Sequence, residues 1–96
     1  SLLPPFYFSC LINSILQMLI KNMRLPHKFN EMHKSVFGTK LPDEILNDII
    51  TMIHNTAKLG DKYTVKHYAW CYKEALIKNG LIIDNGDNSY RIVGRL

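Results

Sequence analysis

The chain has 96 residues, 47% of them hydrophobic and 21% charged, which is the usage of an ordinary globular domain. This length fits one domain, so we expect residues 1–96 to fold as a single unit with a modest core and without help from metals or disulfides. Twelve Lys and Arg against eight Asp and Glu give a net charge of +4, which permits an anionic partner such as nucleic acid but does not require one.

The apolar run over residues 2–20 has to be distinguished from a membrane or signal segment. Pro4 and Pro5 break its start and polar residues recur inside it, so no uninterrupted apolar stretch is long enough to span a bilayer. Basic residues follow the run, whereas a secretory signal has them in front. We therefore expect a protein that is neither secreted nor bound to a membrane.

The two cysteines, Cys10 and Cys71, both fall inside helical patterns and are expected to be reduced thiols that pack as small hydrophobic side chains. Reduced cysteines fit a protein of the nucleus or the cytoplasm. Because the chain starts abruptly at Ser1, we expect it to be a fragment of a longer protein.

Apolar residues recur with helical spacing in four segments. These predicted helices span 8–22, 27–37, 42–58 and 65–79. Pro26 prevents the first helix from continuing, and Gly38 closes the second. Pro42 is a favourable first residue for the third helix, and Thr64 is a favourable N-cap for the fourth. Gly80 is the predicted C-cap of the fourth helix.

The spacing of apolar residues changes after the fourth helix. Two short β-type runs, 81–83 and 90–93, flank turn-forming residues at 85–88, which predicts a β-hairpin. A single hairpin is not stable alone, so it must pack on the helices. The predicted fold class is therefore mainly α with a C-terminal β-hairpin. This is the plan of a winged helix (a helix-turn-helix plus a wing) with one extra helix, and the alternative is a small helical bundle with an appended hairpin.

Two segments at the ends of the chain are similar to parts of a known superfamily. Pro4–Phe8 is a proline-aromatic segment that runs into the first helix, and 75–82 is a helix end with a glycine that leads, through a turn, to 89–92. These segments resemble the opening, the recognition helix and the wing of linker-histone globular domains, and the opening also resembles that of forkhead domains. The resemblance implies a single winged-helix domain in a nuclear or chromatin context.

The chain departs from this family pattern in two ways. It is longer between the first helix and the recognition helix, so either 27–37 or 42–58 is an inserted helix. The basic residues with which the family contacts DNA are not reproduced, because their positions fall near Trp70 and Glu74, and Asp84 and Asp87 occupy the wing. The resemblance therefore supports the fold better than the function.

The outward face of helix 65–79 carries the residues that favour DNA binding. Lys66, Trp70 and Lys73 lie within two turns on one side, where cations can neutralise phosphates and an aromatic ring can meet the bases. We expect duplex DNA binding through this helix and the wing at 81–93, with weak sequence reading and a role in transcription regulation. The candidate DNA contacts are Lys62, Lys66, His67, Trp70, Lys73, Arg91 and Arg95.

Two other interpretations of this helix face are open. An aromatic residue flanked by lysines is also a good anchor for a protein partner, so Trp70 and the adjacent face could serve protein–protein interaction in a nuclear assembly. A homodimer through Leu2–Tyr7 is a variant of this interpretation. Alternatively, Trp70 packs on the third helix or the wing, and the lysines only solvate the surface.

The sequence gives little support for a catalytic site. His67 and Cys71 are four residues apart and can meet on the helix, but no third residue or oxyanion hole is evident beside them. The cysteines and histidines lack zinc spacing, and no glycine-rich phosphate loop is present. We therefore expect a non-enzymatic binding module without metal, cofactor or small-molecule substrate.

Overall fold

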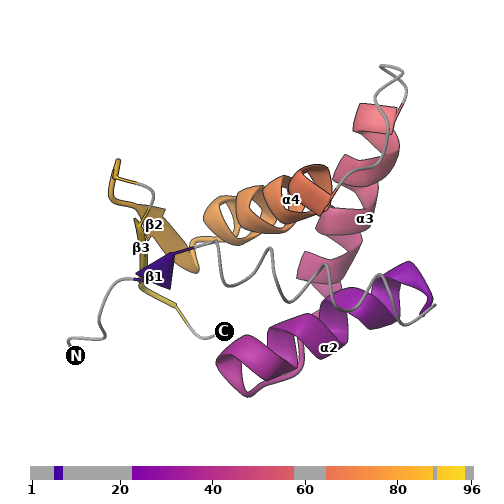
Figure 1. Ribbon diagram of the computed structural model, residues 1–96, viewed down its shortest axis with the longest axis horizontal. Helices are drawn as coiled ribbons and strands as arrows, with labels where there is room; N and C mark the ends of the chain where they lie inside the picture. Colours follow the sequence, from indigo (N-terminus) through magenta and orange to yellow (C-terminus); the bar gives the residue numbers. More distant parts are fainter. Residues whose placement is uncertain (1–5, 8–22, 58–64, 88, 95–96) are drawn as a thin grey trace.

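The computed structural model describes residues 6–7, 23–57, 65–87 and 89–94 of the chain. Its elements are, in order, β1 (Phe6–Tyr7), α2 (Leu25–Phe37), α3 (Asp43–Ala57), α4 (Val65–Lys78), β2 (Ile82–Asp84) and β3 (Ser89–Ile92) (Figure 1). The described part is mainly helical and ends in an antiparallel hairpin, so the predicted fold class is confirmed. The predicted helix over 8–22 and the Thr64 cap lie outside the described residues.

Helix α2 begins two residues earlier than the sequence predicted. Pro26 lies in its first turn, where the missing proline N–H would have no helical partner, so this residue favours the start of the helix. Gly38 ends the helix as expected, because it adopts φ 79° and its N–H donates to the Lys34 carbonyl at 2.8 Å.

Helix α4 passes directly into the hairpin through a glycine turn. Gly80 has φ 72°, and its N–H donates to the Ile77 carbonyl at 3.0 Å. The N–H of Leu81 donates to the Leu76 carbonyl at 3.0 Å, which completes the Schellman pattern at the helix end. The predicted cap at Gly80 is thus confirmed, and it fixes the direction in which β2 leaves α4.

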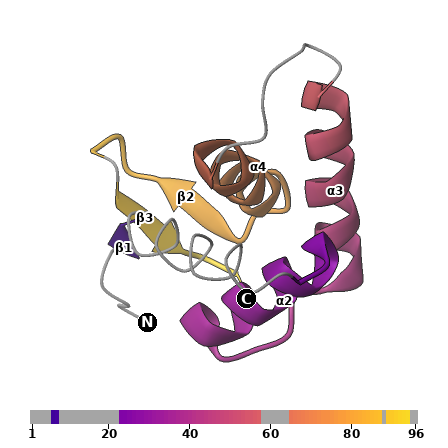
Figure 2. The ribbon, with the colours of Figure 1, turned by 45° about the vertical axis from the view of Figure 1, so that its right-hand side comes forward.

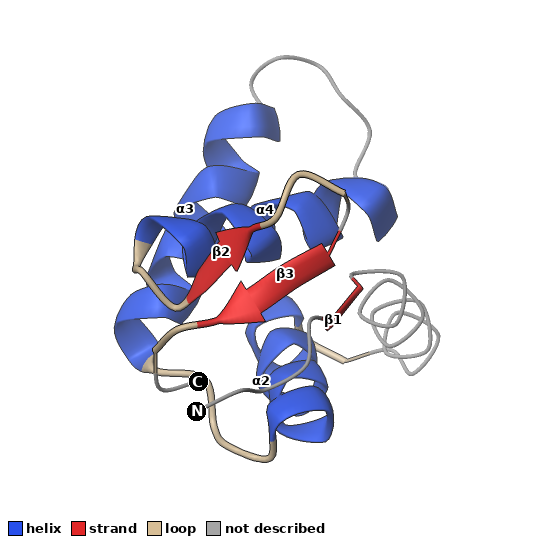
Figure 3. Ribbon diagram, turned by 90° about the vertical axis from the view of Figure 1, so that its left-hand side faces the viewer, coloured by secondary structure: helices blue, strands red, loops and turns tan. Residues whose placement is uncertain are grey.

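The sheet contains a strand that the sequence did not predict. Strand order is β1-β3-β2, with Ile83 opposite Arg91 in the hairpin and Phe6 opposite Tyr90 on the other side of β3 (Figure 3). No local pattern marked this strand, because its partner β3 lies at the far end of the chain. The layout is compatible with a winged helix.

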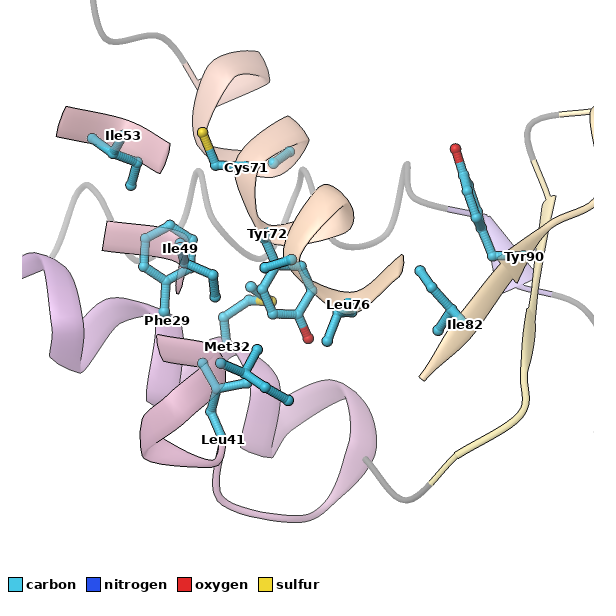
Figure 4. Close-up of a cluster of buried hydrophobic side chains, with 13 residues drawn as sticks. Phe29, Met32, Leu41, Ile49, Ile53, Cys71, Tyr72, Leu76, Ile82 and Tyr90 are labelled. Carbon is cyan, nitrogen blue, oxygen red and sulfur yellow. The ribbon is translucent and has the colours of Figure 1, made fainter. Parts of the chain in front are cut away.

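The core lies where α2, α3 and α4 meet, and α4 lies between α3 and the hairpin (Figure 2). One face of α3 buries Ile45, Ile49 and Ile53, as its apolar spacing predicted. Side chains from all three helices and from the hairpin fill the interior (Figure 4). Among the described residues, no helix combines the length and apolar character needed to cross a bilayer.

Candidate docking surface on helix α4

Helix α4 has a fully covered side and an open side. The covered side contains Ala69, Cys71, Tyr72, Ala75 and Leu76, all with at most 4% of their surface exposed. Among these, Cys71 was expected to pack as a reduced, small hydrophobic side chain, and its burial as a free thiol confirms this. On the opposite side, Trp70 keeps 44% of its surface exposed, although a side chain of this size normally contributes to a core in so small a domain.

The ring of Trp70 stacks on a histidine that is itself held by α3. The His67 and Trp70 ring centroids are 6.3 Å apart with an angle of 20° between the planes. His67 Nε2 lies 2.6 Å from Thr56 Oγ1, and this hydroxyl donates to the Met52 carbonyl at 2.7 Å. Because the hydroxyl proton is used there, His67 Nε2 donates to Thr56. The imidazole is therefore fixed in position and supports one face of the Trp70 ring.

The predicted meeting of His67 and Cys71 is present, but its chemistry is unfavourable for a nucleophile. Cys71 Sγ lies 3.8 Å from His67 Nε2. The thiol is fully buried, and burial raises the pKa of Cys71. A reactive cysteine needs a lowered pKa and access to substrate, so this pair matches packing better than catalysis. The described residues contain no group of three or more His, Cys, Asp or Glu side chains that could hold a metal ion.

The lysines of α4 whose side chains are described both lie beside acidic groups. Lys73 Nζ is 3.8 Å from Glu74 Oε1 and 6.0 Å from the centre of the Tyr90 ring on β3. Lys78 Nζ is 3.7 Å from Asp48 Oδ1 on α3. These contacts use part of the positive charge of α4 within the domain, so fewer free cations face a phosphate backbone.

The hairpin turn adds negative charge next to this helix. The Gly86 N–H donates to Asp84 Oδ1 at 2.8 Å, and the Ser89 N–H donates to Asp87 Oδ1 at 3.0 Å. Two hydrogen bonds from Ser89 lower the pKa of Asp87: the bond from the Ser89 hydroxyl has the larger effect, and the bond from its backbone N–H the smaller. Both carboxylates thus hold the turn in shape, and Gly86 allows it with φ 89°.

The predicted DNA contacts are only partly placed by the described residues. His67, Trp70 and Lys73 share two turns of α4, whereas the exposed Arg91 lies on β3 opposite Ile83. The backbone of Lys66 is in the first turn of α4, and its side chain is not among those that the structure describes. Lys62 and Arg95 also lie outside the described residues.

A buried polar pair between α2 and α4 was missed by the sequence analysis. His33 Nδ1 and the Tyr72 hydroxyl are 2.6 Å apart, and both side chains are fully buried. Burial lowers the pKa of His33 to about 4 and raises the pKa of Tyr72. His33 follows Phe29 by one helical turn, and this spacing was the available signal for its inward position.

Comparisons of the chain with protein-family models, with curated proteins and with solved structures each found no match.

Proposed function

We propose that this chain is a non-enzymatic docking module of the winged-helix type that binds a protein partner through the exposed face of α4, centred on Trp70. The observation that carries the proposal is the half-exposed indole on the face of α4 where Lys73 is already paired with Glu74. Tryptophan is among the residues that contribute most to binding at interfaces, because its ring combines a large apolar area with an N–H donor. The domain would act in a nuclear assembly.

The support under Trp70 makes it a suitable anchor. The His67 ring, held by Thr56, limits the freedom of the indole before a partner binds. Binding a pre-ordered side chain costs less conformational entropy than binding a mobile one. A fitting partner presents an apolar pocket for the indole, with an acceptor for its N–H and polar groups that match Lys73 and Glu74 at the rim.

Duplex DNA binding through α4 and the hairpin, in a chromatin context, is the second candidate. The net charge of +4 and the order of helix followed by hairpin favour it. The paired lysines on α4 and the carboxylates of Asp84 and Asp87 disfavour it, because negative charge near phosphates weakens binding.

The protein-docking proposal is tested by quantitative affinity capture from a nuclear extract with three baits. The baits are the parent chain, Trp70→Ala and Ile83→Ala. The last is a control, because it truncates another exposed hydrophobic side chain, and Ile83 is 43% exposed. We expect at least one protein whose recovery falls about tenfold or more with Trp70→Ala and stays unchanged with Ile83→Ala. The purified partner should then shift the fluorescence of Trp70, the single tryptophan, to shorter wavelength. If no captured protein depends on Trp70, the proposal fails.

A further inference from the structure

Formal charge is distributed unevenly among the described segments. The segment 23–40, which contains α2, holds a net of three positive charges, whereas 41–57, which contains α3, holds three negative charges and no Lys or Arg. In the segment 65–87, three lysines are balanced by three carboxylates. The charged residues of 23–40 are Arg24, Lys28, Glu31, Lys34 and Lys40. The positive charge of the described part is thus concentrated at α2 and not at α4.

The cations of α2 are also less engaged than those of α4. No carboxylate of the described residues lies within 4.0 Å of Arg24, Lys28 or Lys34, whereas Lys73 and Lys78 each have one at 3.8 Å and 3.7 Å. An unpaired cation on the surface can exchange its counterions for phosphates without first breaking a contact inside the protein. The cations of α2 are therefore more available than those of α4 for binding a polyanion.

The geometry of α2 places these cations on one face. Phe29, Met32 and His33 are buried on the inner side of the helix. Arg24 at the N-cap, His27 and Lys34 are exposed on the outer side, and Lys28 is half-buried beside them; these four residues are named the α2 basic face below. Helical spacing places the half-buried Glu31 on the same side, so the face with this carboxylate keeps a net of two positive charges. The face spans about 15 Å along the helix at about 1.5 Å per residue, which is enough to reach several phosphates of one strand. The first turn contains no acidic residue, so the positive end of the helix dipole adds to this field.

We propose that the α2 basic face binds the phosphate backbone of duplex DNA without reading its sequence. A membrane is a poorer match, because binding in the interface needs exposed apolar side chains, and none of the exposed large hydrophobic side chains of the described residues, Trp70, Ile83 and Val93, belongs to α2. A protein partner is disfavoured by the same lack of an apolar anchor on this face. The inference does not depend on the docking role of Trp70.

The test compares two double variants that remove the same amount of charge. Arg24→Gln with Lys34→Gln removes two exposed cations of the α2 basic face, and Lys73→Gln with Lys78→Gln removes the two paired lysines of α4. Both are titrated, beside the parent chain and Trp70→Ala, against random-sequence duplex DNA at about 50 mM and about 200 mM salt. Far-ultraviolet circular dichroism checks that each variant is folded.

We expect the α2 variant to bind about tenfold or more weakly at the lower salt, and its salt slope to fall by about two, roughly one for each phosphate that is no longer neutralised. The affinity of the α4 variant for DNA should fall by less than about threefold. Trp70→Ala should bind DNA as tightly as the parent chain does. Equal effects in the two double variants, a larger effect in the α4 variant, or no DNA binding by the parent chain at the lower salt would overturn the inference. Equally tight binding of the parent chain to vesicles with anionic lipids would overturn the assignment to DNA.

Discussion

Helix α4 is joined to α2 and to α3 by one histidine–hydroxyl hydrogen bond each. Both bonds are 2.6 Å long, but they lie in different surroundings. His33 and Tyr72 are completely buried, and His33 Nε2 has no hydrogen-bond partner among the described residues. His67 and Thr56 are only partly buried, beside the exposed Trp70. Two bonds of equal length therefore have different roles. The His33–Tyr72 pair belongs to the core, and the His67–Thr56 pair positions the surface side chain of Trp70.

This comparison predicts that acid weakens the first contact through His33. Its pKa is about 4 in the folded chain and about 6.5 when unfolded, so the folded state binds fewer protons between these values. The contribution of neutral His33 to the free energy of unfolding is fully present above about pH 6.5. It is lost as the pH drops toward 4, which lowers the free energy of unfolding by about 3 kcal/mol. Urea unfolding near pH 7 and near pH 4 measures this decrease.

Matched histidine variants separate this effect from the titration of carboxylates. His33→Gln should reduce the difference in free energy of unfolding between the two pH values by about 3 kcal/mol, whereas His67→Gln should leave most of it in place. An unchanged pH dependence in His33→Gln would show that the buried ring is not its source.

The two hydroxyl partners provide the next test. Tyr72→Phe removes the hydroxyl that bonds a buried ring nitrogen, so we expect the free energy of unfolding to fall by about 1–3 kcal/mol. Thr56→Val removes a partly exposed hydroxyl, and water can replace it, so we expect a decrease below about 1 kcal/mol. Equilibrium unfolding in urea at neutral pH compares the two. Equal decreases would contradict the difference in burial that separates the two contacts.

His67→Ala should have a small effect on stability, like Thr56→Val. The change should cost less than about 1 kcal/mol, because the side chain lies at the rim of the core. It should nevertheless loosen the Trp70 ring that stacks on it. Time-resolved fluorescence anisotropy of Trp70 measures this motion, with His27→Ala, an exposed histidine on α2, as the control. Identical anisotropy decays in both variants would rule out a supporting role for His67.

Local signals in the sequence were sufficient for the described helices and for their glycine ends. Ile45, Ile49 and Ile53 repeat with helical spacing, and only a residue that tolerates a positive φ fits at Gly38 and Gly80. The start of α2 was predicted two residues too late, because Pro26 was not recognised as a residue that favours the first turn of a helix.

The remaining features depend on pairs that lie far apart along the chain. His33 and Tyr72 are separated by 39 positions and His67 and Thr56 by 11, so neither pair has a local pattern. The pairing of β1 with β3 joins the two ends of the chain for the same reason. The sequence left open whether Trp70 is exposed or packs on a neighbouring element, and the structure shows it exposed. The pairing of Lys73 with Glu74 and of Lys78 with Asp48 also required the packed structure.

The separate use of the two helix faces is tested most directly by an NMR titration of the folded chain with duplex DNA at low salt. We predict that the largest shifts occur at the backbone amides of the α2 basic face, while the indole N–H of Trp70 stays where it is in the free protein. Addition of a captured protein partner should reverse this pattern. Shifts that centre on Trp70 and the hairpin when DNA is added would contradict it and would identify α4 as the DNA-binding helix.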